Sequence, residues 1–470
     1  MRPRFDRLKT VSAALAVLVS FLSPACRNGG TAEKPRPYEE LAERIRTAGL
    51  ESEGAFTLLG RLTTSAAPRL TGSPQADKAV SLMRSEMERL GLESWLEPVT
   101  VQHWVRGEVE KAQILSGPEN TETALSISAL GWSVATPAEG ISAEVIEAES
   151  FEDLRAKSAK VPGRIVFFNH PMDRTSLDAF RSYGQAAQYR SRGASEAARA
   201  GAVAVLVRSA TQRIDDHPHT GMVAYDPQAP RVPAAAVSTS GAEILSAALK
   251  ENPRLKLRLT FSPQTLPDVP SANVVGQIRG SGRPEEIVLL GAHLDSWDLA
   301  AGAHDDGAGC AQVMEALRLI LESGIRPKRT IRAVLFMNEE FGASGGRDYA
   351  RNARRKSERH LAAMESDRGG FLPLGFAVGG GPRILERMRR WEYLLASAGI
   401  QWMRLGGGGA DIGPIVQTGA VPMGFVPDAQ RYFDVHHSAL DVLESVHPRE
   451  LELGAVVLAI MAFIVAEEGI

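Results

Sequence analysis

Histidine and acidic residues recur in short motifs along the second half of the 470-residue chain. The motifs are His293-x-Asp295, His304-Asp305-Asp306, Asn338-Glu339-Glu340, Glu365-Ser366-Asp367 and His436-His437-x-x-x-Asp441. Taken singly, each has an ordinary explanation, such as a surface hydrogen bond, a helix N-cap or a solvated acidic face. Taken together, they supply the mixed His and carboxylate ligands that zinc and other borderline divalent metals prefer. The sequence therefore predicts a metal site.

Buried parallel strands are predicted to bring these motifs to one edge of a sheet. Ile287–Leu290 is a continuous apolar run, Gly309–Leu321 has helical periodicity, and Thr330–Met337 is again strand-like. This alternation indicates parallel strands with crossover helices, and open α/β sheets bind ligands at the carboxyl ends of such strands. His293 and Asp295 are two residues apart, so in an extended chain one can bind a metal while the other orients the imidazole.

Charge balance favours two metal ions at this site. If Asp305, Glu340 and Asp367 are ionised ligands, their three negative charges meet the four positive charges of two divalent ions, and one hydroxide makes the site neutral. Such ions polarise a carbonyl group and lower the pKa of a water molecule to roughly 7. Of the adjacent glutamates, one can bind metal while the other accepts the proton of the water as a general base.

In this order and spacing, the motifs resemble those of the co-catalytic zinc exopeptidases, the aminopeptidase/glutamate carboxypeptidase superfamily. Further stretches share the resemblance, which extends over about residues 38–466: Gly291–Gly309, His103–Glu108, Pro218–Gly221 and Arg326–Thr330. The resemblance implies hydrolysis of a peptide bond next to a chain terminus, in a dipeptide or short peptide. It also implies two Zn²⁺ ions and a homodimer. The metal itself is left open, because sites made of His and carboxylate can also take cobalt or manganese.

The resemblance assigns roles to individual residues. His293 and Asp367 would hold one zinc ion, Glu340 and His437 would hold the other, and Asp305 would bridge them. Glu339 would be the general base, and Asp295 the partner that orients His293.

The predicted fold is α/β: a phosphorylase/hydrolase-like zinc peptidase domain with a mixed, mostly parallel sheet. It is built from residues 38–106 and 264–470, and Asp77–Leu90 is expected to be an amphipathic helix. Residues 107–263 contain short strands broken by Pro and Gly, with one helix expected at Ala194–Ala200. This segment resembles the β-rich protease-associated insert of such enzymes.

Three further features of the sequence leave alternatives open. His304 could offer a donor near the metals, but a loop histidine facing solvent is the favoured interpretation. Tyr432 could donate a hydrogen bond to a developing oxyanion or simply pack beside the site. The glycine run Gly406–Gly409 permits close backbone approach, and a substrate-facing loop is one interpretation of it.

The N-terminus has the form of an export signal. Basic residues precede an apolar run that ends in Ser23-Pro24-Ala25-Cys26, which predicts a signal peptide over residues 1–25 and a tether over 26–37. The cleavage region resembles that of bacterial lipoproteins, so lipidation of Cys26 and a membrane tether are considered. The expected location is periplasmic, extracellular or membrane-tethered. A second apolar run, Gly454–Ala466, is too short for a bilayer and is predicted to be a buried helix.

Composition and spacing narrow the classes of function. With 53 Lys and Arg against 56 Asp and Glu, the net charge is −3, which does not indicate a nucleic-acid partner. About 70 residues separate Asp367 from His437, too few for the lid domain of aminoacylase-like deacylases. Another amide hydrolase, a glutaminyl cyclase-like transferase and a non-catalytic binding module remain as alternatives. The sequence does not distinguish aminopeptidase, carboxypeptidase and dipeptidase specificity.

Overall fold

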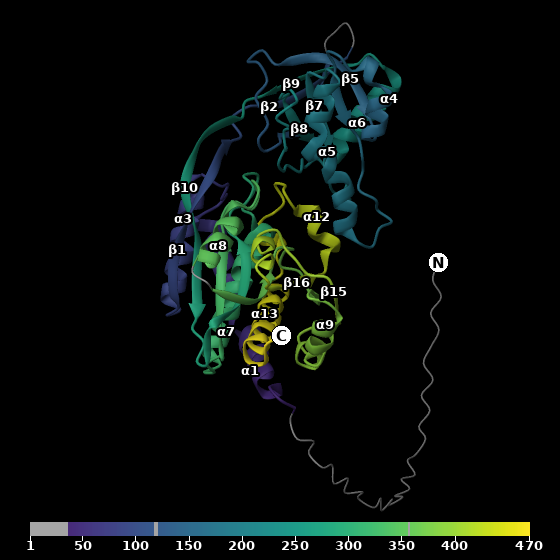
Figure 1. The fold of residues 1–470 in the computed structure, drawn as a ribbon. Coiled ribbons are helices and arrows are strands. Elements are labelled where there is room, and N and C mark those ends of the chain that lie inside the picture. The colour runs from purple at the N-terminus through teal and green to yellow at the C-terminus, as the bar shows by residue number, and fades with distance from the viewer. Residues whose placement is uncertain (1–35, 117–120, 356–357) are drawn as a thin grey trace, which may run out of the picture. The chain divides into compact units, whose positions relative to one another are not determined.

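The computed structural model describes residues 36–116, 121–355 and 358–470 (Figure 1). The predicted signal peptide, Cys26 and most of the predicted tether lie outside the described residues. Residues Tyr38–Ile470 form one structural unit. Within the described residues Cys310 is buried and unpaired, so no disulfide involves it.

An eight-stranded sheet carries the motifs, with strand order β1-β10-β12-β11-β13-β16-β14-β15. The strands are β1 Glu93–Val105, β10 Gln264–Ile278, β11 Arg283–His293, β12 Arg329–Phe336, β13 Arg359–Glu365, β14 Pro373–Val378, β15 Trp402–Leu405 and β16 Val421–Pro427. The central strands β12, β11, β13 and β16 are parallel, whereas β1, β10 and β14 pair antiparallel with a neighbour. The predicted mixed α/β fold is confirmed.

Ten α-helices belong to the described parts of the chain outside the second sheet's segment. They are α1 Glu39–Ser52, α2 Gly54–Ser65, α3 Pro74–Arg89, α7 Ala308–Glu322, α8 Ser344–Arg355, α9 Pro382–Arg389, α10 Glu392–Ala396, α11 Gly413–Val416, α12 Tyr432–Val435 and α13 Pro448–Glu468. Several of them, such as α3, α7 and α13, pack on the first sheet. The predicted helix at Asp77–Leu90 is α3, which begins earlier because Ser73 caps it by accepting the amide of Ala76 and Pro74 occupies its first turn.

The second predicted apolar helix is also confirmed. Gly454–Ala466 lies within α13, and these residues are buried in the main hydrophobic core together with residues of α7 and of the sheet. Among the described residues, no helix has the length and apolarity that crossing a membrane requires.

A second eight-stranded sheet lies between Glu110 and Phe261 in the sequence, with strand order β3-β2-β9-β5-β6-β7-β8-β4. Its strands are β2 Glu110–Ser116, β3 Thr121–Leu125, β4 Ile127–Ala129, β5 Ile141–Ala148, β6 Ile165–Phe168, β7 Ala204–Arg208, β8 Ala234–Val237 and β9 Lys256–Phe261. Strands β5 to β8 are parallel.

The helix expected at Ala194–Ala200 is present as the end of a longer helix, but the expectation of a single helix in this segment is wrong. The second sheet is accompanied by three helices: α4 Phe151–Ala156, α5 Ala179–Arg199 and α6 Thr239–Glu251. The buried face of α5 consists mainly of small residues, such as Ala186, Gly193 and Ala197, so few large apolar residues mark this helix in the sequence. The segment is therefore α/β rather than simply β-rich.

Two long antiparallel strands join the sheets (Figure 1). β1 leads to the second sheet and β10 returns from it, and they pair from Glu93 opposite Gln277 to Val105 opposite Gln264. Directly after β1, Arg106 forms ion pairs with Glu110 at the start of β2 and with Asp298 in the loop after β11. The second sheet is thus connected both to the edge of the first sheet and to the loop that carries the first site motif.

Candidate metal centre

The predicted site residues follow strands that end at one edge of the first sheet. β11 ends at His293, β12 at Phe336 and β13 at Glu365. The parallel register pairs His293 with Phe336 and Gly291 with Glu365. Because these strands end almost level, the segments that follow β12 and β13 lie next to His293, as the sheet-edge argument predicted.

All five predicted metal ligands meet at this edge. Nε2 of His293 lies 3.2 Å from Oδ1 of Asp305 and 3.5 Å from Oδ1 of Asp367. Nε2 of His437 lies 3.1 Å from Oδ2 of Asp305 and 3.2 Å from Oε2 of Glu340. The two carboxylate oxygens of Asp305 therefore face two different histidines, and Asp305 lies between the two pairs of residues.

The hydrogen bonding of this cluster fits bound cations. Oδ2 of Asp305 and Oε1 of Glu340 are buried, and no described group donates a hydrogen bond to them. A buried carboxylate oxygen without a donor is costly unless a cation compensates it. Ligand atoms of His293, Asp305 and Glu340 lie within 4.8 Å of one another. The residues present can therefore hold metal ions.

The acids beside Asp305 hold its loop in place. Asp441 accepts hydrogen bonds from the backbone amides of His304 at 2.6 Å and Asp305 at 3.1 Å. Burial and the charge of Asp305 raise the pKa of Asp441 to about 7. Asp306 accepts the amides of His293 and Gly309, each at 3.0 Å, so it ties the loop to the end of β11 and to the start of α7.

Asp295 contacts His293 in a different way from the one expected. Nδ1 of His293 donates to the backbone carbonyl of Asp295 at 3.0 Å, whereas the Asp295 carboxylate is 3.8 Å from that nitrogen. The carboxylate instead accepts the backbone amides of Asn338, Glu339 and Glu340, at 2.8, 3.0 and 3.3 Å. The main chain of Asp295 thus orients His293, and its side chain positions the loop that carries both glutamates.

The environments of the two adjacent glutamates differ. Burial raises the pKa of Glu339 well above its ordinary value; the charge of His293 opposes this effect, and that of Glu340 adds to it. Glu340 accepts a hydrogen bond from the indole nitrogen of Trp297 at 2.5 Å. Trp297 was not predicted as a site residue, although it belongs to the Gly291–Gly309 stretch.

Residues from a loop and a helix between the strands of the second sheet also reach the cluster, and the sequence did not predict them as site residues. The backbone amide of Thr220 donates to the carbonyl of His437 at 2.9 Å, and Nδ1 of His437 donates to the carbonyl of Thr220 at 3.2 Å. Nδ1 of His219 donates to the carbonyl of His436 at 2.7 Å. Arg190 on α5 also donates to the Thr220 carbonyl, at 3.0 Å. The only signal in the sequence was the Pro218–Gly221 stretch within the resemblance.

The prediction that His304 faces solvent is wrong. His304 is buried, and its ring stacks on Phe371 with centroids 4.3 Å apart and planes 7° apart. Its Nε2 donates to the carbonyl of Ser445 at 3.2 Å, while the amide of Gly370 donates to Nδ1 at 3.1 Å. Both ring nitrogens are engaged, so His304 supports the Asp305 loop and offers no nitrogen to the metals.

Tyr432 and the glycine run lie beside the cluster. Tyr432 is buried in an aromatic group, stacked on Phe180 with centroids 5.5 Å apart. A Cβ on Gly409 would lie 2.1 Å from the Glu365 carboxylate, so at this end of the run the backbone packs directly against a buried acid. The structure thus shows the close backbone approach that the glycine run was expected to permit.

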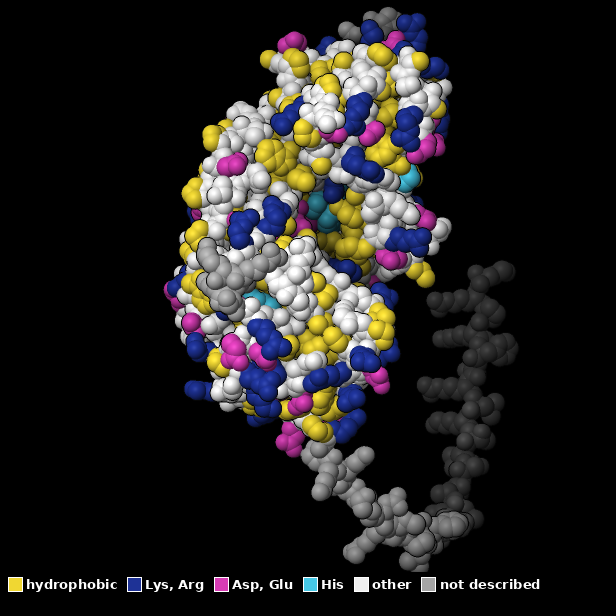
Figure 2. Space-filling model, in the orientation of Figure 1, with side chains coloured by type: hydrophobic (Ala, Val, Ile, Leu, Met, Phe, Trp, Pro, Cys, Tyr) yellow, Lys and Arg dark blue, Asp and Glu magenta, His cyan; other side chains and the backbone are white. Residues whose placement is uncertain are grey.

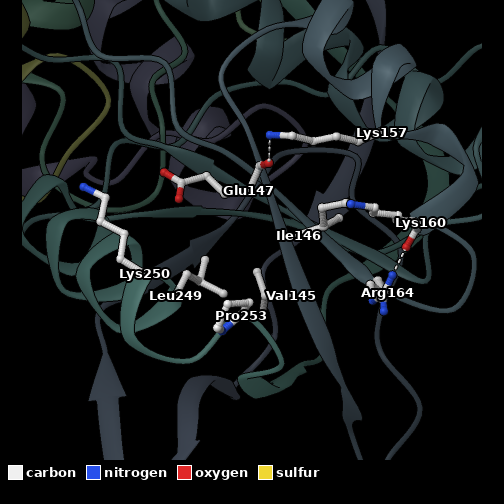
Figure 3. A pocket seen from close by; sticks show the side chains of 9 residues that line it. All are labelled: Val145, Ile146, Glu147, Lys157, Lys160, Arg164, Leu249, Lys250 and Pro253. Atoms are coloured by element: carbon white, nitrogen blue, oxygen red, sulfur yellow. Dashed lines mark hydrogen bonds between the residues drawn. The ribbon is translucent and has the colours of Figure 1, made fainter.

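Two cavities differ in the groups that they offer. A cavity of about 10 Å³ borders Asp305 and His437, with room for about one water molecule. A larger cavity of about 290 Å³ lies in the second sheet, lined by apolar residues and by basic ones such as Lys157 and Arg164 (Figure 3). None of the predicted ligands lines this cavity. Figure 2 shows histidine side chains in a hollow on one face, beside hydrophobic and basic side chains.

The fold and the donor cluster are those expected of an α/β metalloenzyme. The model of "Peptidase family M28" matches residues 273–461. Carboxypeptidase Q of Homo sapiens is 35% identical over 456 residues, which cover 94% of this chain and 93% of that protein. The chain belongs to peptidase family M28, which confirms the resemblance found in the motifs.

Solved structures agree with this assignment. The structure of a peptidase M28 precursor from Shewanella amazonensis has a TM-score of 0.88 and 34% identity, with 92% of this chain and 97% of that chain covered. The structure of a zinc aminopeptidase from Bacillus subtilis has a TM-score of 0.65 and 17% identity, with 89% of this chain and 96% of that chain covered, and it shares the fold.

Proposed function

We propose that this peptidase is a zinc-dependent exopeptidase that hydrolyses terminal peptide bonds of dipeptides or short peptides. The observation that carries the proposal is the position of Asp305, whose two carboxylate oxygens face His293 and His437 separately. A single carboxylate between two donor groups suits a pair of metal ions about 3.5–4 Å apart, the arrangement of many hydrolases that act on acyl groups.

Zinc is the proposed metal because the ligand set combines imidazole nitrogens with carboxylate oxygens. His293 and Asp367 would hold one ion, Glu340 and His437 the other, and Asp305 both. When bound, the ions supply Lewis acidity, which polarises a carbonyl group and makes a water molecule more acidic.

Glu339 is the proposed general base. It takes a proton from a water molecule as the oxygen attacks the scissile carbonyl carbon, and it returns that proton to the nitrogen of the leaving amine when the C–N bond breaks. The products are a carboxylate and a free amine. The Asp295 carboxylate supports this role because it holds the amide of Glu339 at 3.0 Å.

Replacement of Glu339 by Gln tests the base assignment. The variant keeps the shape and hydrogen-bonding capacity of the side chain but cannot accept the proton, so turnover should fall by about 10²–10⁴-fold while zinc content stays unchanged. Purified variant and wild type are compared for zinc per chain and for release of free amino acids. Retention of a tenth of the wild-type turnover would exclude Glu339 as the base.

The terminus that the enzyme recognises is addressed by a panel of dipeptides that are unblocked, N-acetylated or C-amidated, with zinc and with a chelator. The name of the human relative suggests recognition of a free carboxyl terminus, and that of the Bacillus protein suggests a free amino terminus. Chelator-sensitive release from any set supports the proposed function, and the blocked set that is still cleaved shows which terminus is dispensable. No release by a protein with two bound zinc ions would reject peptide hydrolysis.

Several further expectations are part of the proposal. The chain is exported through residues 1–25, and Cys26 is the candidate for lipidation and a membrane tether. Residues 107–263 form a protease-associated insert between two parts of the peptidase domain, 38–106 and 264–470. The enzyme is expected to act as a homodimer, and sedimentation of the mature protein measures this directly.

A further inference from the structure

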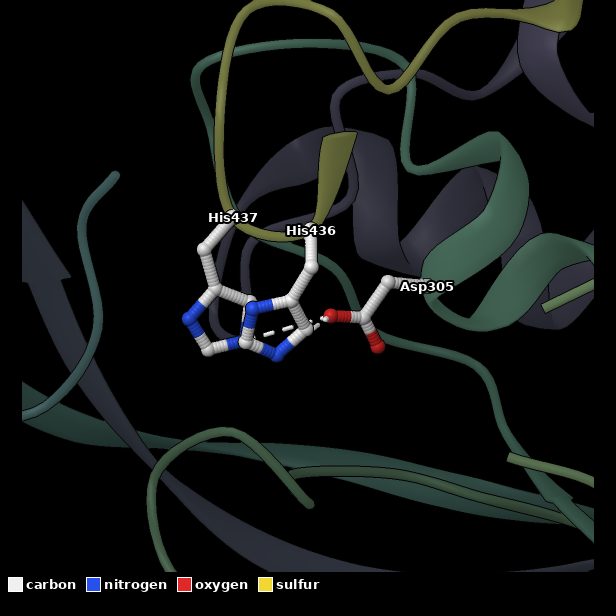
Figure 4. A group of neighbouring side chains, drawn as sticks. All are labelled: Asp305, His436 and His437. Carbon is white, nitrogen blue, oxygen red and sulfur yellow. Dashed lines mark ion pairs between the residues drawn. The ribbon is translucent and has the colours of Figure 1, made fainter. Parts of the chain in front are cut away.

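His436 was not among the predicted ligands, yet it faces the cluster. Its side chain is buried, and its Nε2 lies 3.5 Å from Oδ2 of Asp305. Ligand atoms of Asp305, His436 and His437 lie within 4.8 Å of one another. Figure 4 shows the two imidazole rings stacked beside the Asp305 carboxylate.

The stacking of the two rings excludes His436 as a second ligand of the ion that His437 would bind. The rings of His436 and His437 have centroids 3.6 Å apart and planes only 16° apart. An imidazole binds a metal along a direction in its own plane, so two stacked rings cannot both direct a nitrogen at the same ion; the ligands of a tetrahedral zinc site must converge from different directions. If His437 binds metal, the Nε2 of His436 is directed at a point beside the ion.

The surroundings of His436 fix this orientation. His219 donates a hydrogen bond to its carbonyl at 2.7 Å, and the edges of neighbouring aromatic rings enclose its ring. Tyr183 lies at a centroid distance of 5.0 Å and an angle of 82°, and Phe433 at 5.2 Å and 70°. Nδ1 is buried without a described partner, so Nε2 is the polar edge that reaches the cluster.

We propose that His436, through its Nε2–H, donates the hydrogen bond that stabilises the oxyanion formed when water attacks the scissile carbonyl. This inference rests on the proposed peptide hydrolysis. In the attack, the water oxygen bonds to the carbonyl carbon, Glu339 takes the proton, and the electron pair of the C=O double bond moves to oxygen. His436 bonds to that oxygen until the C=O bond re-forms, the C–N bond breaks and Glu339 protonates the amine. His436 itself neither gains nor loses a proton.

The assignment differs from the one that the sequence offered for Tyr432. The aromatic group around Tyr432 accounts for its position by packing alone, and none of the described hydrogen bonds involves its hydroxyl. Nε2 of His436, by contrast, lies near an oxygen of the proposed bridging residue. If His436 is the oxyanion donor, a variant that removes its N–H should lose activity, and a variant that removes the Tyr432 hydroxyl should not. If Tyr432 is the donor, the two results should be reversed.

The experiment compares wild type with His436→Phe, His436→Gln and Tyr432→Phe in the full mature chain. Phe keeps the stacking on His437 without a donor, Gln restores an N–H, and Tyr432→Phe removes only the hydroxyl. Each protein is characterised by zinc per chain, by thermal melting, by kcat and KM for the dipeptide cleaved best in the panel, and by its affinity for a phosphinic analogue of that dipeptide.

Loss of one oxyanion donor lowers kcat by about 10²–10³-fold, which is the expected effect of His436→Phe with unchanged KM and zinc content. Affinity for the tetrahedral, anionic phosphinic analogue should fall by a comparable factor, because the analogue resembles the transition state. His436→Gln should recover part of both losses. Tyr432→Phe should retain most of the activity.

Three outcomes would overturn the inference while leaving the proposed function intact. Loss of zinc from both His436 variants would make His436 a ligand. Unchanged kcat and unchanged phosphinic affinity in His436→Phe would exclude it as a donor. A large loss in Tyr432→Phe with an active His436→Phe would transfer the role to Tyr432. If wild-type protein with two zinc ions cleaves no dipeptide of the panel, the proposed function and this inference are both rejected.

Discussion

Removing the hydrogen bond from His219 to the carbonyl of His436 tests whether the domain of the second sheet supports the metal centre. His219 is 2% exposed, and its Nδ1 lies 2.7 Å from that carbonyl oxygen. The substitution His219→Ala removes the donor and leaves a buried carbonyl without this partner. The adjacent His437 is a proposed metal ligand, so its position depends on the same short segment.

The expected loss of metal affinity in His219→Ala can be estimated from the hydrogen bond that is removed. An ordinary hydrogen bond contributes about 1 kcal/mol, and a buried carbonyl left without a donor costs about 1–3 kcal/mol. The second value already includes the first, so a cost of about 1–3 kcal/mol that applies when His437 is ordered for binding raises the metal dissociation constant roughly 5- to 150-fold. His293 and Asp367 do not share this support, so one of the two proposed ions should be lost first.

The assay is a titration of zinc-loaded protein with a chelator, followed by zinc per chain. We expect His219→Ala to release one equivalent at chelator concentrations that leave wild type fully loaded. His217→Ala is the matched control, because His217 lies two residues away and its side chain makes no described hydrogen bond to the 436–437 segment. Equal zinc retention by His219→Ala and wild type would show that the His219 hydrogen bond does not support metal binding. Equal zinc loss by His219→Ala and His217→Ala would show that the effect is not specific to that hydrogen bond.

Two further perturbations probe the proposed bridge and the core of the sheet. Asp305→Ala should remove at least one metal ion per chain, because both proposed ions depend on that carboxylate; unchanged metal content by elemental analysis would contradict its bridging role. Burial and the charge of Arg332 lower the pKa of His360 to about 3. The unfolded chain takes up this proton near pH 6.5, so the native state should lose stability as the pH falls from 6.5 towards 3. His360→Gln should reduce that slope by up to about 1.4 kcal/mol per pH unit in urea unfolding between pH 7 and pH 5, and an unchanged slope would exclude His360.

The meeting of the site motifs at one sheet edge could be predicted from the sequence because it depends on local rules, whereas the choice of the five proposed ligands among these acids and histidines came from the resemblance to the zinc exopeptidases. Parallel strands are continuous apolar runs, their carboxyl ends meet at one edge, and an acidic or histidine-bearing motif after each run marks that edge. The same rules located α3 and α13, which have a strong amphipathic or apolar pattern.

The support of the site could not be found in this way. His219 and Thr220 are each 217 residues from the residue that they contact, and no periodicity links segments so far apart. Asp295 was identified, but whether its carbonyl or its carboxylate reaches His293 depends on backbone dihedrals that residue spacing does not determine. His304 was expected in solvent because it lies in a loop, and its burial depends on distant partners, the ring of Phe371 and the carbonyl of Ser445.

The pairing of β1 with β10 has a consequence for how the chain folds. Val105 and Gln264 are partners at one end of that pairing, so closing it directly would fix a loop of roughly 160 residues. Glu110 and Phe261, a few residues further in, are partners on β2 and β9. Once that pair has formed, the loop still to be closed shrinks to a handful of residues, which lowers the entropic cost by about 2–3 kcal/mol.

Synthesis from the N-terminus favours this order, because residues 110–261 leave the ribosome before β10 is made. β10 lies between β1 and β12 in the first sheet, so completion of that sheet depends on the earlier folding of the second. A variant that slows folding of the second sheet should therefore also delay the assembly of the metal ligands, even if it touches none of them.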